Sequence, residues 1–581
     1  MTRAIGVDLG TTYTVVATIQ DGRPVVIPNA EGQHLTPSVV AFTDGAEPLV
    51  GQQAKDQAVV NPQRTVFSIK RRMGSGYRVR AGGRAYTPQE ISSFILQKVK
   101  ADAQRYLGEE ISQAVVTVPA YFNDLQRQAT KEACALAGLQ LMRIINEPTA
   151  AALAYGVHRE DAHTIFVWDL GGGTFDVSIL ELGEGIFEVR AVSGDSWLGG
   201  DDYDKALTDY LAEEYRRAVG SDYPDDGGLR QRLRELAERA KIELSSSLMT
   251  RVAVPAPNLP EREHVELELT REVFEGLTKD LLGRMVPPTR DVLADAGLGP
   301  DDVGRVILVG GATRMPAVRA LARELLGKEP YRYIDPDEAV AMGAAIQAGM
   351  LLGSIGKVVL LDVLPLSLGV ETQGGLMTRI IRRNTPLPAS GSRIVTTAAD
   401  YQGSMDFQVL QGERALALDN VSLGHFQLNG IPTALKGVPK AEVAFEVDVD
   451  GIAHVYARDL LTDNEVKVAL TSTKFLDPQE IAHLIGEAQS RGEEDRENRE
   501  RIQAGIEADN LIDAARTVLS ELSGEGAEPR RESLTNAVSL VQAALASGPT
   551  RQLQHRCSEL RQILTAMRRK GIKAAGPRRV G

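Results

Sequence analysis

The sequence repeats one local design at two distant places, and this repeat constrains the fold more than any other feature. Residues 5–12, Ile-Gly-Val-Asp-Leu-Gly-Thr-Thr, form an apolar strand that ends in Asp8 and a glycine turn bearing hydroxyls. Residues 166–176, Phe-Val-Trp-Asp-Leu-Gly-Gly-Gly-Thr-Phe-Asp, follow the same plan around Asp169. A third apolar strand ends in a glycine pair at 310–311. Because glycines let backbone N–H groups approach phosphate oxygens closely, the three segments together predict a nucleotide site.

Neither of the common nucleotide-binding signatures accompanies these loops. The chain has no Walker A sequence and no Gly-x-Gly-x-x-Gly after a strand. One such loop by itself would be typical of an ordinary hairpin turn, and that structural alternative applies to each loop taken alone. Two copies followed by a later glycine pair favour an ATP site, in which threonine hydroxyls contact phosphates and aspartates hold hydrated Mg²⁺.

Composition and charge narrow the class of protein. The 581 residues are 43% hydrophobic and 25% charged, and the formal net charge is -13. This acidic balance argues against nucleic acid as the main partner, because phosphate backbones are bound by basic faces. No apolar run approaches the ~20 residues of a membrane span, and we expect no signal peptide. The two cysteines, Cys134 and Cys557, lack metal or redox spacing, so we expect buried thiols and a cytoplasmic protein.

The hydrophobic pattern changes along the chain. Residues 1–355 alternate short apolar strands with amphipathic helices, which predicts an α/β domain. One helix start is explicit at residues 87–90, Thr-Pro-Gln-Glu, with an N-cap, a first-turn proline and a capping-box glutamate. After residues 477–480, Asp-Pro-Gln-Glu, the pattern is helical to about residue 570 and predicts a solvated bundle or lid. The last residues, 571–581, are expected to be a basic disordered tail.

Between about 362 and 475 the period of the pattern becomes two. Ala441, Val443, Phe445, Val447 and Val449 point one way and alternate mainly with acidic residues, and an Asp-Gly turn follows. This alternation is typical of an antiparallel sheet with one buried face.

Longer stretches of the chain resemble the seventy-kilodalton heat-shock protein family, most closely its bacterial DnaK branch, from residue 3 to about 570. The matching stretches are residues 61–71, 116–124, 144–151, 169–176, 238–245, 336–340, 360–363, 365–369, 409–414 and 450–451. The resemblance implies a two-lobed actin-like ATPase domain (1–355), an interdomain linker (356–363), a β-sandwich that binds peptide (364–475) and a helical lid (476–570). It implies an ATP-dependent chaperone whose nucleotide state switches its affinity for extended hydrophobic segments of unfolded proteins.

The resemblance also implies roles for individual residues. Nucleotide contacts are expected from Gly10, Thr11, Thr12, Gly171, Gly172, Gly173, Thr174, Gly310 and Gly311, and an adenosine pocket from Glu238, Lys241, Ser245, Arg314 and Asp337. Mg²⁺ would be held through water by Asp8 and Asp169, and the attacking water would be positioned by Lys70 with support from Glu147, Asp169 and Asp176. A relay to the linker would run through Pro119, Arg127, Leu360, Leu361 and Asp362. The peptide groove would be lined by Val370, Gln373, Val395, Ala398, Met405 and Phe407.

Taken without the family, several of these residues have simpler interpretations. Lys70 would be a surface cation in a basic cluster, and Glu147 an acid at a helix start. Glu238 and Lys241 would be an i,i+3 helix ion pair, and Pro119 an ordinary strand-end proline. The linker segment would serve equally well as a buried strand, and the groove residues as plain sandwich core.

Partners follow from the same resemblance. We expect unfolded or nascent polypeptides, a J-domain co-chaperone that contacts Arg143, Asn146 and Thr149, and a nucleotide-exchange factor, with the protein itself monomeric. Three departures favour a specialised paralogue: a short segment between Lys70 and residue 87, Gln373 where DnaK has a methionine arching over the peptide, and a tail without the acidic motif of eukaryotic members. A metabolite kinase or a filament-forming relative on the same actin-like fold is the alternative, although neither requires residues 362–570.

Overall fold

The computed structural model describes residues 3–43, 47–81, 83–156, 163–183, 185–257, 259, 263–331, 335–356, 358–469, 492–522 and 527–569. The chain forms two compact units. The first comprises Met1–Leu368, Ile380–Asp406 and Ser422–His483, and the second comprises Gly369–Arg379, Phe407–Val421 and Leu484–Gly581. The helix start predicted at residue 477 and the predicted basic tail lie outside the described residues.

Two mixed sheets of the first unit share one arrangement. Their strand orders are β11-β10-β1-β2-β3 and β17-β12-β13-β14-β18. In both sheets the strand that carries a repeated loop, β1 or β12, pairs antiparallel with the next strand in the chain and parallel with a later one. The sequence repeat is therefore a structural repeat. The bounds are β1 (Ala4–Leu9), β2 (Tyr13–Gln20), β3 (Arg23–Val26), β10 (Gln113–Val118), β11 (Gln140–Asn146), β12 (His163–Leu170), β13 (Phe175–Gly183), β14 (Ile186–Asp195), β17 (Arg305–Val309) and β18 (Val359–Leu361).

Helices and short strands complete this part of the first unit. The helices are α1 (Gln52–Asp56), α2 (Pro88–Leu107), α3 (Asp124–Leu136), α4 (Glu147–Gly156), α5 (Gly200–Val219), α6 (Gly227–Ser246), α7 (Arg271–Leu277), α8 (Lys279–Gly283), α9 (Val286–Ala296), α10 (Pro316–Leu326) and α11 (Ala339–Leu351). The short strands are β4 (Thr36–Pro37), β5 (Val40–Ala41), β6 (Leu49–Val50), β7 (Thr65–Val66), β8 (Val79–Ala81), β9 (Arg84–Tyr86), β15 (Met249–Pro255) and β16 (His264–Thr270). The predicted start of α2 is confirmed, because Thr87 and Glu90 form a capping box at its N-terminus.

Helices α4 and α11 pack against each other through small residues. A Cβ atom on Gly343 of α11 would lie only 1.8 Å from the carbonyl oxygen of Ala150 in α4. Glycine is therefore required at this crossing. Helix α11 also contacts β1. The close approach of α4 to α11 therefore fixes Glu147, at the start of α4, relative to β1.

The period-two segment forms an antiparallel sheet of the first unit in the order β21-β24-β25-β26. Its strands are β21 (Ala389–Thr396), β24 (Lys440–Val447), β25 (Ala453–Asp459) and β26 (Glu465–Ala469). Ala441, Val443, Phe445 and Val447 are buried, as predicted. Val449 was expected on the same face, and this prediction is wrong: its side chain is 47% exposed because β24 ends at Val447, before the turn.

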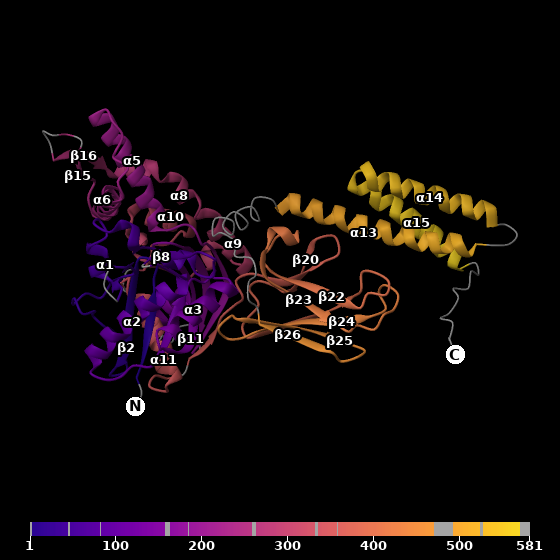
Figure 1. Cartoon of the computed structure of the whole chain (residues 1–581), viewed down its shortest axis with the longest axis horizontal. Helices are drawn as coiled ribbons and strands as arrows, with labels where there is room; N and C mark the ends of the chain where they lie inside the picture. The colour runs from indigo at the N-terminus through magenta and orange to yellow at the C-terminus, as the bar shows by residue number, and fades with distance from the viewer. Residues whose placement is uncertain are drawn as a thin grey trace. The chain divides into compact units, whose positions relative to one another are not determined.

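The second unit contains a C-terminal helical region, as the sequence predicts. Helices α13 (Gly492–Glu521), α14 (Ala527–Ser547) and α15 (Thr550–Arg569) lie side by side (Figure 1). A shared apolar core that includes Ala508, Leu534, Val541 and Leu560 holds them together. The remaining named strands are β19 (Leu368–Thr372), β20 (Leu376–Ile381), β22 (Ser404–Gln411) and β23 (Val421–Asn429). Most of β19, β20 and β22 belongs to the second unit, and β23 after Val421 belongs to the first. Over the described residues, every helix is too short or too polar to cross a membrane.

Candidate active site

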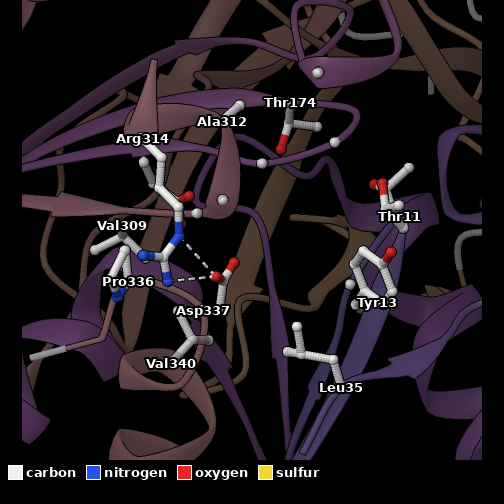
Figure 2. Close-up of a pocket in the computed structure, with 18 of the residues that line it drawn as sticks. Thr11, Tyr13, Leu35, Thr174, Val309, Ala312, Arg314, Pro336, Asp337 and Val340 are labelled. Atoms are coloured by element: carbon white, nitrogen blue, oxygen red, sulfur yellow. Dashed lines mark hydrogen bonds and ion pairs between the residues drawn. The ribbon is translucent and has the colours of Figure 1, made fainter. Parts of the chain in front are cut away.

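A cavity of about 350 Å³ in the first unit collects most of the predicted nucleotide residues. Figure 2 shows Arg314 directed at Asp337, with Tyr13 and Leu35 on the opposite wall of the cavity. The predicted residues that line it are Asp8, Gly10, Thr11, Thr12, Lys70, Glu147, Asp169, Gly171, Gly172, Thr174, Glu238, Lys241, Ser245, Gly310, Gly311, Arg314 and Asp337. The cavity therefore lies where the two repeated loops and the third glycine segment meet.

The two repeated loops touch each other at this cavity. A Cβ atom on Gly172 would lie 1.9 Å from Oγ1 of Thr12, so the second loop can approach the first only because it has glycine there. The two loops bring hydroxyls and glycine backbone to one wall of the cavity. Such a wall offers many donors to an oxyanion and has no bulky side chain in the way.

Lys70 and Glu147 form a buried ion pair in the same cavity. The Nζ atom of Lys70 donates to Oε1 of Glu147, and the two residues are 5% and 8% exposed. The interpretation of Lys70 as a surface cation is therefore wrong. Glu147 does begin helix α4, as its simpler interpretation requires, but its carboxylate faces the lysine. A buried lysine beside several carboxylates is a charge arrangement that suits the positioning of a polar reactant.

Three aspartates surround this ion pair. Burial, followed by the charge of Glu147, raises the pKa of Asp8 to about 7 and that of Asp176 to about 7. The same two causes, in the same order, raise the pKa of Asp169 well above its usual value. Carboxylates whose ionised form is disfavoured by burial would be stabilised as anions by a divalent cation. The donor set of Asp8 and Asp169 therefore fits Mg²⁺, whose waters would complete its shell.

A metal ion can be bound directly by protein side chains or through its own water molecules. Within the described part of the chain, no group of three or more His, Cys, Asp and Glu side chains is placed to hold a metal directly. This arrangement is compatible with the predicted water-mediated site.

Several residues that line the cavity form ion pairs with other segments of the chain. Arg314 pairs with Asp337 at 2.7 Å. Glu238 pairs with Lys55 at 3.0 Å, and Lys241 pairs with Asp204 at 2.8 Å. The interpretation of Glu238 and Lys241 as a mutual helix ion pair is therefore wrong, because both find partners on other segments.

Two predicted residues stand behind the cavity wall. The carbonyl oxygen of Gly173 accepts from Arg71. The carboxylate of Asp176 is buried, and its Oδ1 accepts from the backbone N–H of Tyr121 at 3.1 Å. Sequence reasoning missed several lining residues: Tyr13, Val15, Leu35, Gly200, Asp204, Ile242, Val309, Ala312, Met315, Pro336 and Val340. Some of these residues adjoin the predicted loops or lie in the stretch 336–340, and the run Gly-Gly-Asp-Asp at 199–202, at the start of helix α5, was a further signal.

Two of the predicted relay residues, Arg127 and Asp362, are joined through Asn146, which was predicted as a J-domain contact. Arg127 is buried and donates to Oδ1 of Asn146 at 2.7 Å. Asn146 donates in turn to both carboxylate oxygens of Asp362, at 2.9 and 2.8 Å. Pro119 directly follows β10, as its simpler interpretation requires. Leu360 and Leu361 belong to β18, which pairs in parallel with β14, so this segment is a strand here.

The turn after β24 contacts the same region. The backbone N–H of Ile144 donates to Asp450 at 2.9 Å, and the N–H of Ala453 donates to Asp124 at 2.7 Å. Burial raises the pKa of Asp124 to about 6. These contacts join residues separated by more than 300 positions in the sequence.

The residues predicted to contact a J-domain are largely covered. Asn146 is 1% exposed and Thr149 is 0% exposed, so neither offers its side chain to a partner in this structure. Arg143 is half-buried and is the accessible member of the three.

The predicted groove residues divide between the two compact units. In the second unit, Val370 and Phe407 are buried and Gln373 is exposed. In the first unit, Met405 is buried, Val395 is half-buried and Ala398 is exposed. Within the second unit, a Cβ atom on Gly374 would lie 2.7 Å from Cγ2 of Ile502, so the turn next to Gln373 packs on α13.

Comparison with known protein families identifies the class to which this fold and site belong. The family described as Hsp70 protein matches residues 4–80 and 75–573. The chain therefore belongs to the Hsp70 family. Proteins of this family are ATP-dependent chaperones that bind nucleotide and act on unfolded polypeptides with J-domain and exchange-factor partners.

Proposed function

We propose that this protein hydrolyses ATP in the cavity around Lys70 and uses the nucleotide state to control its grip on extended apolar peptide segments. The observation that carries the proposal is the buried Lys70–Glu147 pair, placed between the two glycine loops and beside Asp8 and Asp169. Positioning and charge neutralisation are the main needs of phosphoryl transfer, and this arrangement supplies both.

The chemistry assigned to the site is hydrolysis of the terminal phosphate of ATP. A water oxygen bonds to the γ-phosphorus, the bond from that phosphorus to the bridging oxygen breaks, and ADP, phosphate and a proton result. Lys70 holds the water and the γ-phosphate oxygens, and Glu147 keeps the lysine in place. The Oδ1 atom of Asp176 accepts from the backbone N–H of Tyr121 at 3.1 Å, and the charges of Glu147 and Lys70 act on its carboxylate. When bound, Mg²⁺ would neutralise phosphate charge, and Asp8 and Asp169 are the residues that would hold it through water.

The adenosine end is assigned to Glu238, Lys241, Ser245, Arg314 and Asp337. Two observations support this assignment: all five line the cavity, and Arg314 and Lys241 are held there by ion pairs. Thr11, Thr12 and Thr174 are assigned to the phosphates because their loops meet around the glycines.

Coupling to peptide is assigned to the chain of contacts through Asn146. Asp362 stands at the end of β18, and its carboxylate is held by the residue that directly precedes Glu147. A ligand shifts a conformational equilibrium only by its differential affinity for the two states. We assign the docked linker, with β18 paired to β14, to the ATP-like state, and its release to the ADP state.

The domain arrangement that we propose is a two-lobed actin-like ATPase domain to residue 355, a linker at 356–363, a peptide-binding β-sandwich at 364–475 and a helical lid at 476–570. The duplicated sheets around β1 and β12 support the two lobes. The bundle of α13, α14 and α15 supports the lid. A kinase or a filament subunit would require neither the antiparallel sheets nor the bundle, so the chaperone is preferred.

Peptide contacts are assigned to Val370, Gln373, Val395, Ala398, Met405 and Phe407. Burying one leucine is worth ~1.5–3 kcal/mol, and each backbone hydrogen bond adds about 1 kcal/mol. A few such contributions, less the ordering costs, suit roughly micromolar binding and no strict sequence specificity. A J-domain partner is proposed at the surface around Arg143.

The proposal is tested with Lys70→Ala. The variant should bind ATP but lose hydrolysis by at least about a hundredfold, because positioning of the water is lost. Phosphate formation in single turnover and binding of a fluorescent ATP analogue measure the two properties separately. Arg78→Ala, an exposed cation of the same region, is the control. Near-normal hydrolysis by Lys70→Ala would contradict the assigned chemistry.

A further inference from the structure

Two more cavities lie beside the nucleotide cavity in the first unit, one of about 30 Å³ and one of about 690 Å³. The small cavity shares Thr11, Thr12, Asp204 and Glu238 with the nucleotide cavity. It shares Phe67, Ser68 and Asp201 with the large one. The three spaces therefore form a row that leads from the part of the nucleotide cavity that includes Thr11 and Thr12 into the large cavity.

The large cavity reaches the surface and is basic. Its lining includes five basic side chains and two acidic ones. Two of the basic residues, Lys205 and Arg230, have side chains that are 76% and 66% exposed, which places them at a solvent mouth. Arg234 lines both the large and the small cavity. A cleft lined by an excess of one charge attracts the opposite charge, so this one favours anions.

Contacts made by the side chains of Ser68 and Arg71 lie along this row. The Oγ atom of Ser68 donates to Oδ2 of Asp201 at 2.5 Å. Arg71 donates to the carbonyl oxygen of Gly173 at 3.1 and 2.9 Å and to Asp202 at 2.5 Å. Both aspartates lie in the first turn of α5, and Ser68 has a left-handed backbone with φ of 53°. A change of side-chain rotamers at Ser68 and Arg71 would break these two contacts with the start of α5.

We propose that inorganic phosphate leaves the protein by this row of cavities, with the Ser68–Asp201 and Arg71–Asp202 contacts as its gate. The inference rests on the proposed hydrolysis. Phosphate would form beside Lys70. Bound ADP would then lie between the phosphate and the residues assigned to adenosine. A second exit lets phosphate depart while ADP stays bound. The small cavity is lined by four acidic and two basic side chains, so the basic lining favours the dianion only in the large cavity.

The experiment uses beryllium fluoride, a phosphate-sized anion, on the full chain already loaded with a fluorescent ADP analogue and Mg²⁺. Binding of the anion is followed as trapping of the fluorescent ADP. If the anion enters beside bound ADP, trapping should be faster than ADP dissociation measured in the same buffer. Trapping that never exceeds the rate of ADP dissociation would overturn the proposal, because the anion would then need the adenosine end to empty first.

Three variants locate the route. Arg234→Gln removes one positive charge from the lining and should slow trapping about three- to tenfold. Ser68→Ala removes the gate contact and should make trapping faster. Arg232→Gln is the matched control, since Arg232 stands on the same helix, is 52% exposed and lines none of the three cavities. Equal rates for Arg234→Gln and Arg232→Gln would also overturn the route.

The result is separable from a failure of the proposed function. Acid-quenched single turnovers of the unaltered protein show whether ATP is cleaved at all. No cleavage would contradict the hydrolysis and the exit route together. Normal cleavage with trapping that is insensitive to Arg234 and Ser68 would contradict the exit route alone.

Discussion

Asn146 and Glu147 are neighbours in the chain, and their side chains hold two different parts of the first unit. Glu147 accepts a hydrogen bond from Lys70 in the cavity. Asn146 donates to both carboxylate oxygens of Asp362, next to β18. A single peptide unit at the junction of β11 and α4 therefore links the proposed catalytic lysine to the proposed linker.

Asn146→Ala should uncouple the two parts. Loss of its hydrogen bonds leaves the buried Asp362 carboxylate under-satisfied, which costs about 1–3 kcal/mol of linker docking. We expect peptide to stop stimulating ATP hydrolysis, with basal hydrolysis changed by no more than about twofold because Lys70 and Glu147 remain paired. Steady-state phosphate release with and without an apolar peptide measures this. Replacing Leu360 and Leu361 with aspartate should give the same loss, and stimulation that survives both changes would mean that the linker is only a tether.

Acidification should strengthen the contact between α3 and the turn before β25. Burial raises the pKa of Asp124 from 3.8 to about 6. The raised pKa belongs to the state in which Asp124 contacts the turn, so that state binds a proton more readily than the separated state. The free-energy cost of burying the ionised carboxylate is therefore greatest above pH 6. The contact should therefore gain up to about 1.4 kcal/mol per pH unit as the pH falls between 6 and 4.

Hydrogen exchange of the Ala453 amide, corrected for its intrinsic pH dependence, measures this change. Asp124→Asn still offers an oxygen to Ala453 but does not titrate, so the pH dependence should flatten. Burial raises the pKa of Asp450 and Asp362 as well, so any residual dependence in that variant should have the same sign. His454→Gln is the control for the nearby imidazole, and an unchanged slope in Asp124→Asn would show that another group is responsible.

Gly343→Ala should destabilise the protein and inactivate it. The new methyl group would lie 1.8 Å from a backbone oxygen of α4, so α4 and α11 must separate, at a cost of about 3 kcal/mol or more. Glu147 at the start of α4 would move with it. Thermal unfolding followed by circular dichroism measures the loss. Gly276→Ala is the matched control: its added Cβ has open space within α7, and a gain of about 0.5–1 kcal/mol is expected. Similar melting temperatures for the two variants would show that α4 and α11 can move apart without a large loss of stability.

Gln373→Met should slow the release of bound peptide from the ADP-bound protein. The adjacent Gly374 packs on Ile502 and Ile506 of α13, so a flexible apolar side chain at 373 can join this contact. One extra apolar contact of about 1 kcal/mol corresponds to roughly fivefold slower dissociation. Fluorescence of a labelled peptide measures the rate. Gln503→Met, an exposed position on α13, should leave the rate unchanged. Equal rates of peptide dissociation from the parent and Gln373→Met would show that residue 373 does not help to retain the bound peptide.

Local features of this protein were predictable from short stretches of sequence. The two repeated loops, the capping box of Thr87 and Glu90, and the buried face of β24 each depend on residues within about ten positions. Strand and helix periods and glycine turns are set by backbone sterics and by neighbouring side chains, so they can be inferred without the rest of the chain. Where the local pattern failed, at Val449, the reason was the exact end of a strand, which periodicity does not define.

The pairings that make a site were decided only by the tertiary structure. Lys70 and Glu147 are 77 positions apart, and Asn146 and Asp362 are 216 apart. Sequence alone left Lys70 as a surface cation, and it paired Glu238 with Lys241 although their partners are Lys55 and Asp204. Such contacts depend on the order and direction of strands in the two repeated sheets and on the crossing of α4 with α11. An amphipathic pattern states which face of an element is buried, but it does not state which distant segment that face will meet.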